Sequence, residues 1–441
     1  MSLSNHPKAY GTAAVTFAFM TGILLTLGFK DFYPDLERRY QRRKGQPSSP
    51  ADSRPASTYL PPVKLEDRSR SARQSMVGLP IGPVPEGIEG CIGNTPLFKI
   101  KSLSEATGCT ILAKAEFLNG AGGSPKDRVA LNMIKVAEEE GLLTPGQGDT
   151  IYEGTVGSTG ISLATLARAR GYKCHICMPN DQSTEKSDLL HHLGATVERV
   201  TPAPITSTQH FVNLARTRAK EHTASAETSS KGFFADQFES TANYRAHFQT
   251  TGPEIYQQAS GQIDAFVAGA GTGGTISGVA VFLKQEMGMS HDLKVVLADP
   301  EGSGLYNKVK HGVMFSNTER EGTRRRQQVD TIVEGIGINR LTENFEAGRE
   351  LIDDAVKVTD LQALRMARWL VEKDGIFVGS SSAVNCVAAV ATAFNMPKGS
   401  RVVTILCDSG TRHLSKFWKN VAESGLEEDE QSDLIELLGI K

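Results

Sequence analysis

One lysine in this sequence stands where its amine could act as a nucleophile and as a base. Lys126 follows a glycine-rich turn at residues 119–125. Within this segment Ser124 can cap a helix, Pro125 suits the first helical position, and Asp127 completes a capping box. The positive end of the helix dipole disfavours an ammonium in the first turn, so we expect a lowered pKa for the Lys126 amine. A solvated lysine beside a tight turn is the alternative that this segment leaves open.

The residues after Lys126 have the spacing of an amphipathic helix. Apolar side chains recur at intervals of three and four residues, at Ala130, Met133, Ile134 and Ala137. Gly141 follows them and predicts the end of the helix. Lys126 would therefore lie in the first turn of a helix that has one apolar face.

A second segment has the pattern of an anion site. Residues 263–284 indicate a buried strand, a glycine-rich turn and a helix that begins near Thr275. Backbone amides at glycines approach a phosphate closely, threonine hydroxyls donate to it, and the helix dipole favours its charge. The residues concerned are Gly271, Thr272, Gly273, Gly274 and Thr275. A dinucleotide site is disfavoured, because no acidic residue suited to a ribose follows a proper GxGxxG. A cofactor with a phosphate and an aldehyde would unite this turn with Lys126, and pyridoxal 5'-phosphate is such a cofactor.

Strand-like and helix-like segments alternate from about residue 88 to residue 418. Such alternation is typical of an α/β fold with largely parallel sheets, and the length allows two sheets with a cleft between them. The predicted strands are 110–116, 148–154, 173–179, 195–200, 263–271, 293–300, 375–380 and 401–410, and the helices between them include 161–170, 185–193 and 360–373.

The composition favours small-molecule chemistry over nucleic-acid binding. The chain has 441 residues with 48 basic and 50 acidic side chains, which gives a formal net charge of −2. No overall positive field would recruit nucleic acid. Cysteines are sparse and do not form the dense pattern of a secreted disulfide scaffold, which favours a reducing compartment.

The remaining candidate metal, redox and acidic groups are interpreted as structural. Cys174 and Cys177 form a CxxC in an apolar, strand-like run, and no second pair completes a zinc set. His191 and His192 lie in a helical pattern, where solvent exposure or packing explains them better than metal binding. Asp408 follows a buried strand and is expected to cap the next turn. We predict no metal site.

The N-terminal segment predicts a membrane anchor. Residues 11–29 contain no charged side chain and are long enough to cross a bilayer as a helix. Basic residues are concentrated after this segment, between Lys30 and Lys44, so the C-terminal side should face the cytosol. No small-residue cleavage site is evident, and the arginines follow the apolar run, unlike those of a matrix presequence. We expect a single-pass anchor in the mitochondrial outer membrane or, alternatively, in the endoplasmic reticulum membrane.

The whole chain divides by composition. Residues 1–45 would hold the anchor with its basic flank, and the proline- and serine-rich residues 46–85 a flexible linker. Residues 86–420 would form the catalytic region, with two α/β subdomains. Residues 421–441 are expected to be an acidic, solvated tail.

A run of motifs resembles one enzyme family. In order they are IGNTPLFKI from Ile92, GGSPKDR from Gly122, EGTVGSTGISLA from Glu153, DQFESTANYRAHFQTTGPEI from Asp236, AGTGGTISG from Ala270, EGIGINR from Glu334, VGSSSAV from Val378 and DSGTRHLSKF from Asp408. They are similar to the successive motifs of the cysteine synthase and cystathionine β-synthase family. Together with the N-terminal anchor, they most resemble its fungal, membrane-anchored branch. The resemblance implies the two-domain pyridoxal-phosphate fold type II, similar to tryptophan synthase β chains, and a homodimer.

The resemblance also implies a role for each matching residue. Lys126 would be the Schiff-base lysine, residues 271–275 the phosphate loop, and Ser381 the partner of the pyridine nitrogen. A serine hydroxyl at that place does not force protonation of the ring nitrogen, which suits β-elimination and replacement. A plain helix cap is the alternative for Ser381. The substrate carboxylate would be held by Thr155, Val156, Gly157, Ser158, Thr159 and Gln237.

The chain departs from the family pattern within this implied site. Ser158 stands where the family usually has an asparagine that contacts the cofactor's ring hydroxyl. Val156 replaces a serine of the carboxylate loop, and residues 119–121 replace an Asn-Pro with one extra residue before Ser124. These departures bear on the electronics of the cofactor and on the choice of substrate.

The activity implied by the resemblance is that of a cysteine synthase, which replaces the acetate of O-acetylserine by sulfide. Lys126 would remove the α-proton of the amino acid and later return it. Two alternatives stay open. One is replacement or elimination on serine or threonine, as in cystathionine β-synthase or a deaminase. The other is a weakly catalytic, cofactor-binding protein at a membrane surface.

Overall fold

The computed structural model describes residues 84–181, 184–314, 331–424 and 434–439. The predicted anchor at residues 1–45, with its helix at 11–29, lies outside the described residues, as does nearly all of the linker at 46–85. Within the described ranges, no helix combines the length and the apolar character that crossing a bilayer requires.

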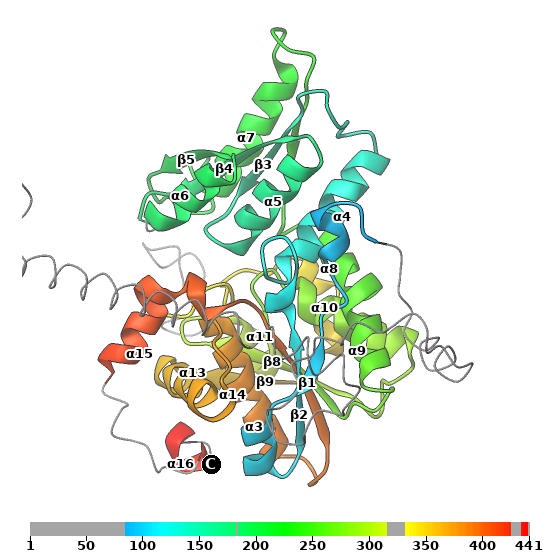
Figure 1. Cartoon of the computed structure of the whole chain (residues 1–441), viewed down its shortest axis with the longest axis vertical. Coiled ribbons are helices and arrows are strands. Elements are labelled where there is room, and N and C mark those ends of the chain that lie inside the picture. Colours follow the sequence, from blue (N-terminus) through cyan, green and yellow to red (C-terminus); the bar gives the residue numbers. More distant parts are fainter. Residues whose placement is uncertain (1–83, 182–183, 315–330, 425–433, 440–441) are drawn as a thin grey trace, which may run out of the picture. The chain divides into compact units, whose positions relative to one another are not determined.

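The smaller sheet contains parallel strands in the order β5-β4-β3-β6. Its members are β3 (Thr150–Gly154), β4 (Lys173–Pro179), β5 (Thr196–Val200) and β6 (Gly232–Phe234). Every residue of β3 is buried, as expected of a parallel strand that is covered on both faces. Helices α4 (Lys126–Glu139) and α5 (Ser158–Ala169) cover one face, and α7 (Phe211–Ala224) covers the other (Figure 1).

The larger sheet has the strand order β1-β2-β10-β7-β8-β9. Its strands are β1 (Leu97–Lys99), β2 (Thr110–Ala115), β7 (Ala265–Gly269), β8 (Lys294–Pro300), β9 (Asp354–Val358) and β10 (Arg401–Leu406). Only β1 runs antiparallel to its neighbour among these strands. Alternate residues of β7 face two hydrophobic cores: Val267 packs with the core of one face and Phe266 with the core of the other.

Helices cover both faces of the larger sheet (Figure 1). Helix α14 is buried nearly all round, because its sequence from Ser380 to Phe394 consists mainly of small and apolar residues. It packs with α13 on one face, whereas α9, α10 and α11 lie on the other. The remaining helices are α3 (Lys101–Thr107), α6 (Thr184–His192), α8 (Ala242–Ala246), α9 (Gly252–Gln258), α10 (Gly274–Ala280), α11 (Leu305–His311), α12 (Glu343–Glu346), α13 (Asp360–Asp374), α15 (Lys419–Glu423) and α16 (Leu434–Leu438).

The α/β prediction is confirmed, and most predicted strands are present. The strand expected at 375–380 is wrong: Val378 makes only an isolated bridge to Ser409, and α14 begins two residues later. Residues 354–358 and 232–234 form strands that the sequence analysis does not predict. Both are short, and neither has a long apolar run to indicate it.

The capping box predicted before Lys126 is present only in part: the Asp127 carboxylate accepts from the backbone N–H of Ser124 at 3.5 Å, but the other half differs. Helix α4 begins at Lys126 with Pro125 as its N-cap. The hydroxyl of Ser124 accepts from the backbone N–H of Lys126 at 3.2 Å, and not from that of Asp127. The Asp127 carboxylate reaches further back and accepts from the N–H of Gly122 and of Gly123, both at 2.8 Å. These bonds fold the glycine-rich turn onto the start of the helix.

The solvated tail expected after residue 420 is also corrected. Val421 is buried in the hydrophobic core that contains Val267 and α14, and α16 places Leu434 and Leu438 in the same core. The side-chain amide of Gln362 on α13 donates to the carbonyl oxygen of Leu438 at 2.8 Å. Apolar residues beyond the acidic run therefore return to the fold, a pattern that charge alone does not predict.

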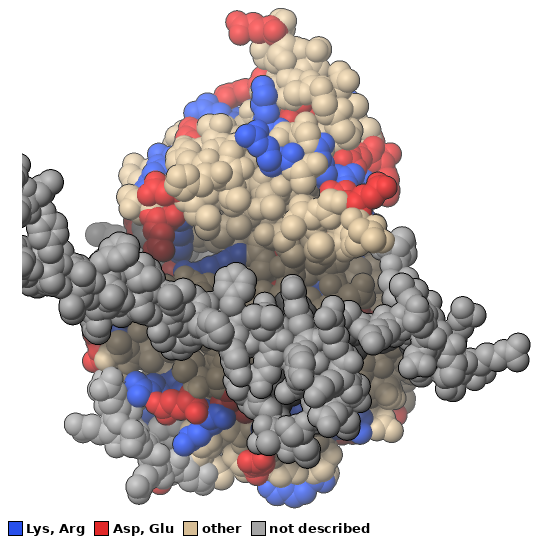
Figure 2. All heavy atoms as spheres, viewed as in Figure 1, with Lys and Arg blue, Asp and Glu red and all other residues tan. Residues whose placement is uncertain are grey.

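The described surface carries charges of both signs. On the face shown in Figure 2, lysines and arginines lie interspersed with aspartates and glutamates. Several form exposed pairs, such as Lys310 with Asp354 at 2.7 Å. This face therefore offers no continuous basic patch among the residues shown in colour.

A buried group of alternating charges holds the helix of Lys126 in place. Arg128 donates to both oxygens of Glu116, each at 2.8 Å, and to those of Glu254 at 2.6 and 2.8 Å. Lys114 contacts Glu254 at 2.6 Å and donates to the carbonyl oxygen of Thr95 at 2.6 Å. Two cations thus balance two anions, although burial opposes every charge. Their mutual contacts keep the pKa of Glu116 and of Glu254 below the usual value.

Replacing Arg128 with alanine is expected to destabilise the protein by about 3–5 kcal/mol, because it leaves Glu116 buried without its counter-charge. The full-length protein is titrated with denaturant. The measurement is the free energy of unfolding of the region that begins at residue 84. Lys310→Ala, which removes one exposed partner of Asp354, is the control and should cost less than about 1 kcal/mol. Equal losses in the two variants would contradict the role given to the buried charges.

Candidate functional site

The candidate residues follow the carboxyl ends of parallel strands in both sheets. Residues 155–159 come after β3 and Gln237 comes shortly after β6 in the smaller sheet. Residues 271–275 come after β7, and Asp408 comes after β10, in the larger sheet. Ligands of α/β proteins bind at this end of parallel strands, so the fold brings the predicted residues to the expected edges.

Lys126 is the first residue of α4 and is partly buried, so it is not a solvated surface lysine. Burial lowers the pKa of its amine, while the nearby Cys407 and Asp408 oppose that shift. The expected direction of the pKa shift is confirmed, and loss of hydration is its main cause. Part of the Lys126 population is therefore available as a free amine at a lower pH than for an exposed lysine.

The glycine-rich turn after β7 leaves no room for side chains, because other segments of the chain pack directly against its backbone. Gly273 has φ 86°, a conformation that favours glycine, and a Cβ there would lie 2.5 Å from the Cα of Phe345. A Cβ on Gly271 would lie 2.3 Å from the carbonyl oxygen of Gly335, and one on Gly274 would overlap the side chain of Asn243. Helix α10 starts at Gly274, directly after the turn. This arrangement of bare backbone at a helix start fits a phosphate.

Polar side chains hold the two threonines of this turn. Thr272 Oγ1 accepts from Nδ2 of Asn243 at 2.9 Å. Thr275 Oγ1 lies 3.2 Å from Nε2 of His247, whose Nδ1 lies 2.9 Å from the hydroxyl of Thr251. Full burial holds the pKa of His247 well below its usual value, so the ring is neutral.

His247 is a site residue that the sequence pattern does not indicate, although it lies within the motif from Asp236 to Ile255. The separation in sequence between His247 and the predicted phosphate loop does not indicate that the two are in contact. Only the packing of α10 against the π-turn at His247–Thr251 brings the imidazole to Thr275.

The predicted carboxylate loop leads into α5. The backbone N–H of Gly157 donates to the Thr155 hydroxyl at 3.3 Å, and α5 begins at Ser158. Thr159 donates to Oε1 of Gln237 at 2.6 Å, so the structure brings together two residues that the resemblance assigns to one site. Val156 is partly buried and Gly157 is exposed.

Ser158, which replaces the family's asparagine, has a partner from the other sheet. Its hydroxyl accepts from Nη1 of Arg412 at 3.4 Å. Arg412 follows β10, whereas Ser158 follows β3. This hydrogen bond connects the two halves of the candidate site.

Ser381 lies in the first turn of α14 and is 4% exposed. The N-cap of α14 is Gly379, with no side-chain cap, so the helix-cap alternative for Ser381 is wrong. Its hydroxyl instead interacts with the thiol of Cys407, whose pKa burial raises to about 11. Because Cys407 also lies near Lys126, Ser381 and Lys126 share one neighbourhood.

The role predicted for Asp408 is corrected. The turn after it is capped by Ser409, whose hydroxyl accepts from the N–H of Thr411 at 3.3 Å. Asp408 instead contacts Nε2 of His413 at 3.0 Å, and this pairing outweighs burial and raises the pKa of His413. Ser409 takes the cap because the carboxylate of Asp408 turns toward the histidine.

The CxxC residues lie on opposite faces of β4, since they are three positions apart in a strand. Cys174 packs in the core with α4 and α5, whereas Cys177 packs with α7. The ligand atoms of Cys177, His175 and Glu198 lie within 4.8 Å of one another. Arg218 donates to both oxygens of Glu198, at 3.2 and 2.9 Å, and so already neutralises that carboxylate.

His191 and His192 lie in the last turn of α6, and both are exposed, as predicted.

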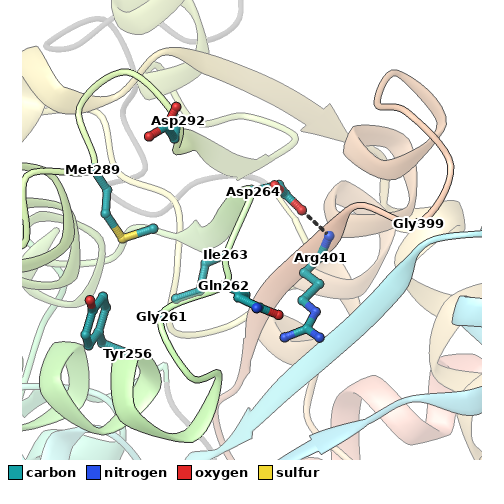
Figure 3. Close-up of a pocket in the computed structure, with 9 residues that line it drawn as sticks. All are labelled: Tyr256, Gly261, Gln262, Ile263, Asp264, Met289, Asp292, Gly399 and Arg401. Atoms are coloured by element: carbon teal, nitrogen blue, oxygen red, sulfur yellow. Dashed lines mark hydrogen bonds between the residues drawn. The ribbon is translucent and has the colours of Figure 1, made fainter.

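A pocket of about 420 Å³ lies at the amino ends of β7 and β10 (Figure 3). Its lining includes Tyr256, Asp264 and Arg401, and the backbone N–H of Arg401 donates to Oδ2 of Asp264 at 2.6 Å. None of the predicted site residues lines this pocket. It opens at the end of the strands opposite to the one that carries the phosphate loop.

Comparisons with known proteins agree with this geometry. A profile of the family described as pyridoxal-phosphate dependent enzyme matches residues 88–408. Cysteine synthase 2 of Neurospora crassa is 69% identical over 456 aligned residues, which cover 100% of this chain and 99% of that protein. A Saccharomyces cerevisiae protein with "mitochondrial cysteine synthase" in its name is 56% identical over 338 residues, 77% of this chain and 85% of that protein. The solved structure of O-ureido-L-serine synthase matches with a TM-score of 0.65 at 30% identity, over 80% of this chain and 98% of its own.

These matches confirm the expected fold, with parallel sheets flanked by helices as in pyridoxal-phosphate fold type II. They also extend over the segments that hold Lys126 and the phosphate loop. The chain belongs to the pyridoxal-phosphate-dependent enzymes, in the family of the cysteine synthases.

Proposed function

We propose that this protein is a cysteine synthase that replaces the acetate of O-acetylserine with sulfide. The observation that carries the proposal is a lysine of lowered pKa at the start of α4, next to the loop that follows β10. The Neurospora relative, which aligns over the whole chain, bears the name of that activity. Lys126 is thus the proposed attachment point of pyridoxal 5'-phosphate.

The cofactor would be held by residues that follow strands of both sheets. The bare backbone at residues 271–275 would bind its phosphate, with the Thr275 hydroxyl positioned by His247. Ser381 would face its pyridine nitrogen, and Ser158 its ring hydroxyl. When bound, the cofactor supplies an electron sink that makes the α-proton of an amino acid acidic.

Lys126 would then move the proton. An amine whose pKa is lowered by burial is more readily deprotonated, so it can accept the α-proton at Nζ and return it afterwards. The residues from Thr155 to Thr159 would hold the substrate carboxylate with backbone N–H groups at the start of α5, together with Gln237. Fixing the carboxylate places the α-carbon in front of Lys126.

The subcellular localisation of the protein is a separate proposal. We infer that residues 1–45 anchor it in the mitochondrial outer membrane, with the catalytic region in the cytosol. The lack of charge from residue 11 to residue 29 and the basic flank support this, as does the mitochondrial name of the yeast relative. The homodimer that the resemblance implies stays a prediction.

Lys126→Ala should lose the visible absorption of covalently bound cofactor and slow cysteine formation by about 10²–10⁴-fold, because no other group takes over its proton. Lys135→Ala removes an exposed lysine of the same helix and is the matched control. Absorption spectra and an assay with O-acetylserine and sulfide measure both effects. If wild type used serine with homocysteine faster, or only eliminated ammonia from serine or threonine, the proposed substrate would be wrong. A bound cofactor with no turnover on any of these would favour a weakly catalytic role.

Gly273→Ala is expected to abolish retention of the cofactor, because a Cβ there would meet the backbone of Phe345. Gly288→Ala is the control: Gly288 also has a positive φ, but its Cβ would meet no atom within 4 Å. The control should lose only about 1 kcal/mol of stability. Cofactor content of the purified proteins, measured after dialysis, tests this difference.

A fluorescent fusion of residues 1–45 should label the surface of mitochondria and stay accessible to protease added outside them, as expected of a cytosol-facing anchor. Substituting two charged residues between positions 11 and 29 should release the fusion. Label inside the matrix would contradict the topology, and label on the endoplasmic reticulum would support the alternative membrane.

A further inference from the structure

Glu153 is a buried carboxyl group to which the proposed reaction gives no role. It lies near the end of β3, just before the candidate carboxylate loop, and is 0% exposed. Its Oε1 accepts from Nε2 of Gln237 at 3.1 Å. Its Oε2 has no hydrogen-bond partner among the described residues. Buried polar atoms are nearly always paired, so an unpaired carboxyl oxygen beside a candidate site calls for an explanation.

A chain of hydrogen bonds joins Glu153 to the loop. Thr159 donates to Oε1 of Gln237 at 2.6 Å, and Nε2 of Gln237 donates to Glu153. Since the Gln237 oxygen faces a hydroxyl and its nitrogen faces a carboxyl, the amide has one favourable orientation. Glu153 uses one of the two hydrogens on Nε2, which leaves the other for a ligand.

The backbone next to Gln237 is strained. Asp236 has φ 51°, in the left-handed region that few residues other than glycine adopt. Its Oδ2 accepts from Nη2 of Arg216 at 3.1 Å, whereas its Oδ1 is unpaired among the described residues. Strain of this kind persists where the surroundings fix it and is concentrated at functional sites. Here the backbone conformation of Asp236 fixes the position of the next residue, Gln237, and so the place where its side chain begins.

The surroundings of Glu153 favour its neutral form. Burial raises its pKa to about 8, and the negative charge of Asp236 adds to the shift. The thiols of Cys174 and Cys177 on the neighbouring strand β4 also lie near Glu153, and burial raises the pKa of each to about 12. Arg216 on α7 donates to Asp236. At neutral pH the carboxyl is therefore mostly protonated and adds no charge to the site.

We propose that Glu153 is a positioning residue that holds the Gln237 amide toward the substrate carboxylate and weakens carboxylate binding when it ionises. This inference rests on the proposed carboxylate loop. An ionised Glu153 would lie two hydrogen bonds from Thr159 in a poorly screened interior, where like charges repel strongly. Deprotonation therefore sets an upper pH limit on substrate binding, separate from the titration of Lys126.

The test compares the full-length holoenzyme with its Glu153→Gln variant, which keeps an acceptor oxygen but cannot ionise. The Kd of L-cysteine, the proposed product, is measured from the change in cofactor absorption. All other titrating groups are common to both proteins, so the ratio of Kd in wild type to Kd in the variant isolates Glu153. This ratio is expected to rise about tenfold between about pH 6.5 and pH 9.5. A ratio that stays constant while L-cysteine still binds would overturn the inference and leave the proposed function intact.

Two further variants sharpen the result. Asp236→Asn suits the left-handed backbone and removes the neighbouring charge, so the wild-type pH dependence should move to lower pH. Gln237→Ala should weaken L-cysteine binding at every pH. An unchanged Kd in Gln237→Ala would overturn both the proposed carboxylate loop and the inference, while cofactor absorption would still report on Lys126.

Thermal unfolding gives a readout that does not depend on activity. A carboxyl whose pKa is raised from 4.5 to about 8 on folding stabilises the protein at low pH and loses that contribution as the pH rises. The Tm of Glu153→Gln minus that of wild type should grow from about pH 4.5 to pH 8 and then level off. A difference that does not vary with pH would show that Glu153 ionises as in the unfolded chain, which contradicts the inference.

Discussion

The buried ion pairs of Arg128 are the contact on which the rest of the site depends. They lie two residues after Lys126 on the same helix and join it to Glu116 after β2 and to Glu254 on α9. Charges removed from water are tolerated only when they are matched and held in good geometry. The direction in which α4 leaves the glycine-rich turn is therefore set by two kinds of contact. One is the ion pairs of Arg128, and the other is the hydrogen bonds that Asp127 accepts from the turn. A lysine at the helix start gains a defined position without needing a hydrogen bond of its own.

Parallel strands impose the second constraint. The carboxyl ends of parallel strands lie at the same edge of a sheet. Loops that are far apart in the sequence therefore lie close together there and can contribute different functions to one site. The smaller sheet contributes the loop after β3 and Gln237 after β6, and the larger sheet contributes the phosphate loop and Cys407. Contacts such as that of Arg412 with Ser158 cross between these two sets. Substitutions at Ser158 would therefore also remove a contact between these two sets.

Local chemistry made part of this site predictable from sequence. Lys126 and the glycines after β7 are recognisable because helix starts and bare backbone have short-range signatures, and the α/β alternation follows from apolar runs. His247 and Glu153 are not recognisable in this way, since each acts through a partner brought to it by packing of distant elements. The cap assigned to Asp408 failed for a different reason: a histidine only five residues later competes for the carboxylate. Sequence patterns thus locate backbone-determined parts of a site better than side-chain networks.

The burial of thiols has a consequence for an enzyme that works with sulfide. Sulfide and cysteine are accompanied by disulfides and polysulfides, whose sulfur atoms are attacked by the ionised form of accessible cysteines, with release of a thiolate. Burial raises the pKa of Cys174 and Cys177 to about 12 and that of Cys407 to about 11, and it raises the pKa of Cys386 as well. Cys174, Cys177 and Cys386 are buried, Cys407 is half-buried, and Cys91 is exposed. Because a buried, protonated thiol is a poor nucleophile, the enclosed cysteines are protected from the sulfur species among which the enzyme operates, and Cys91 is the most accessible of the described cysteines.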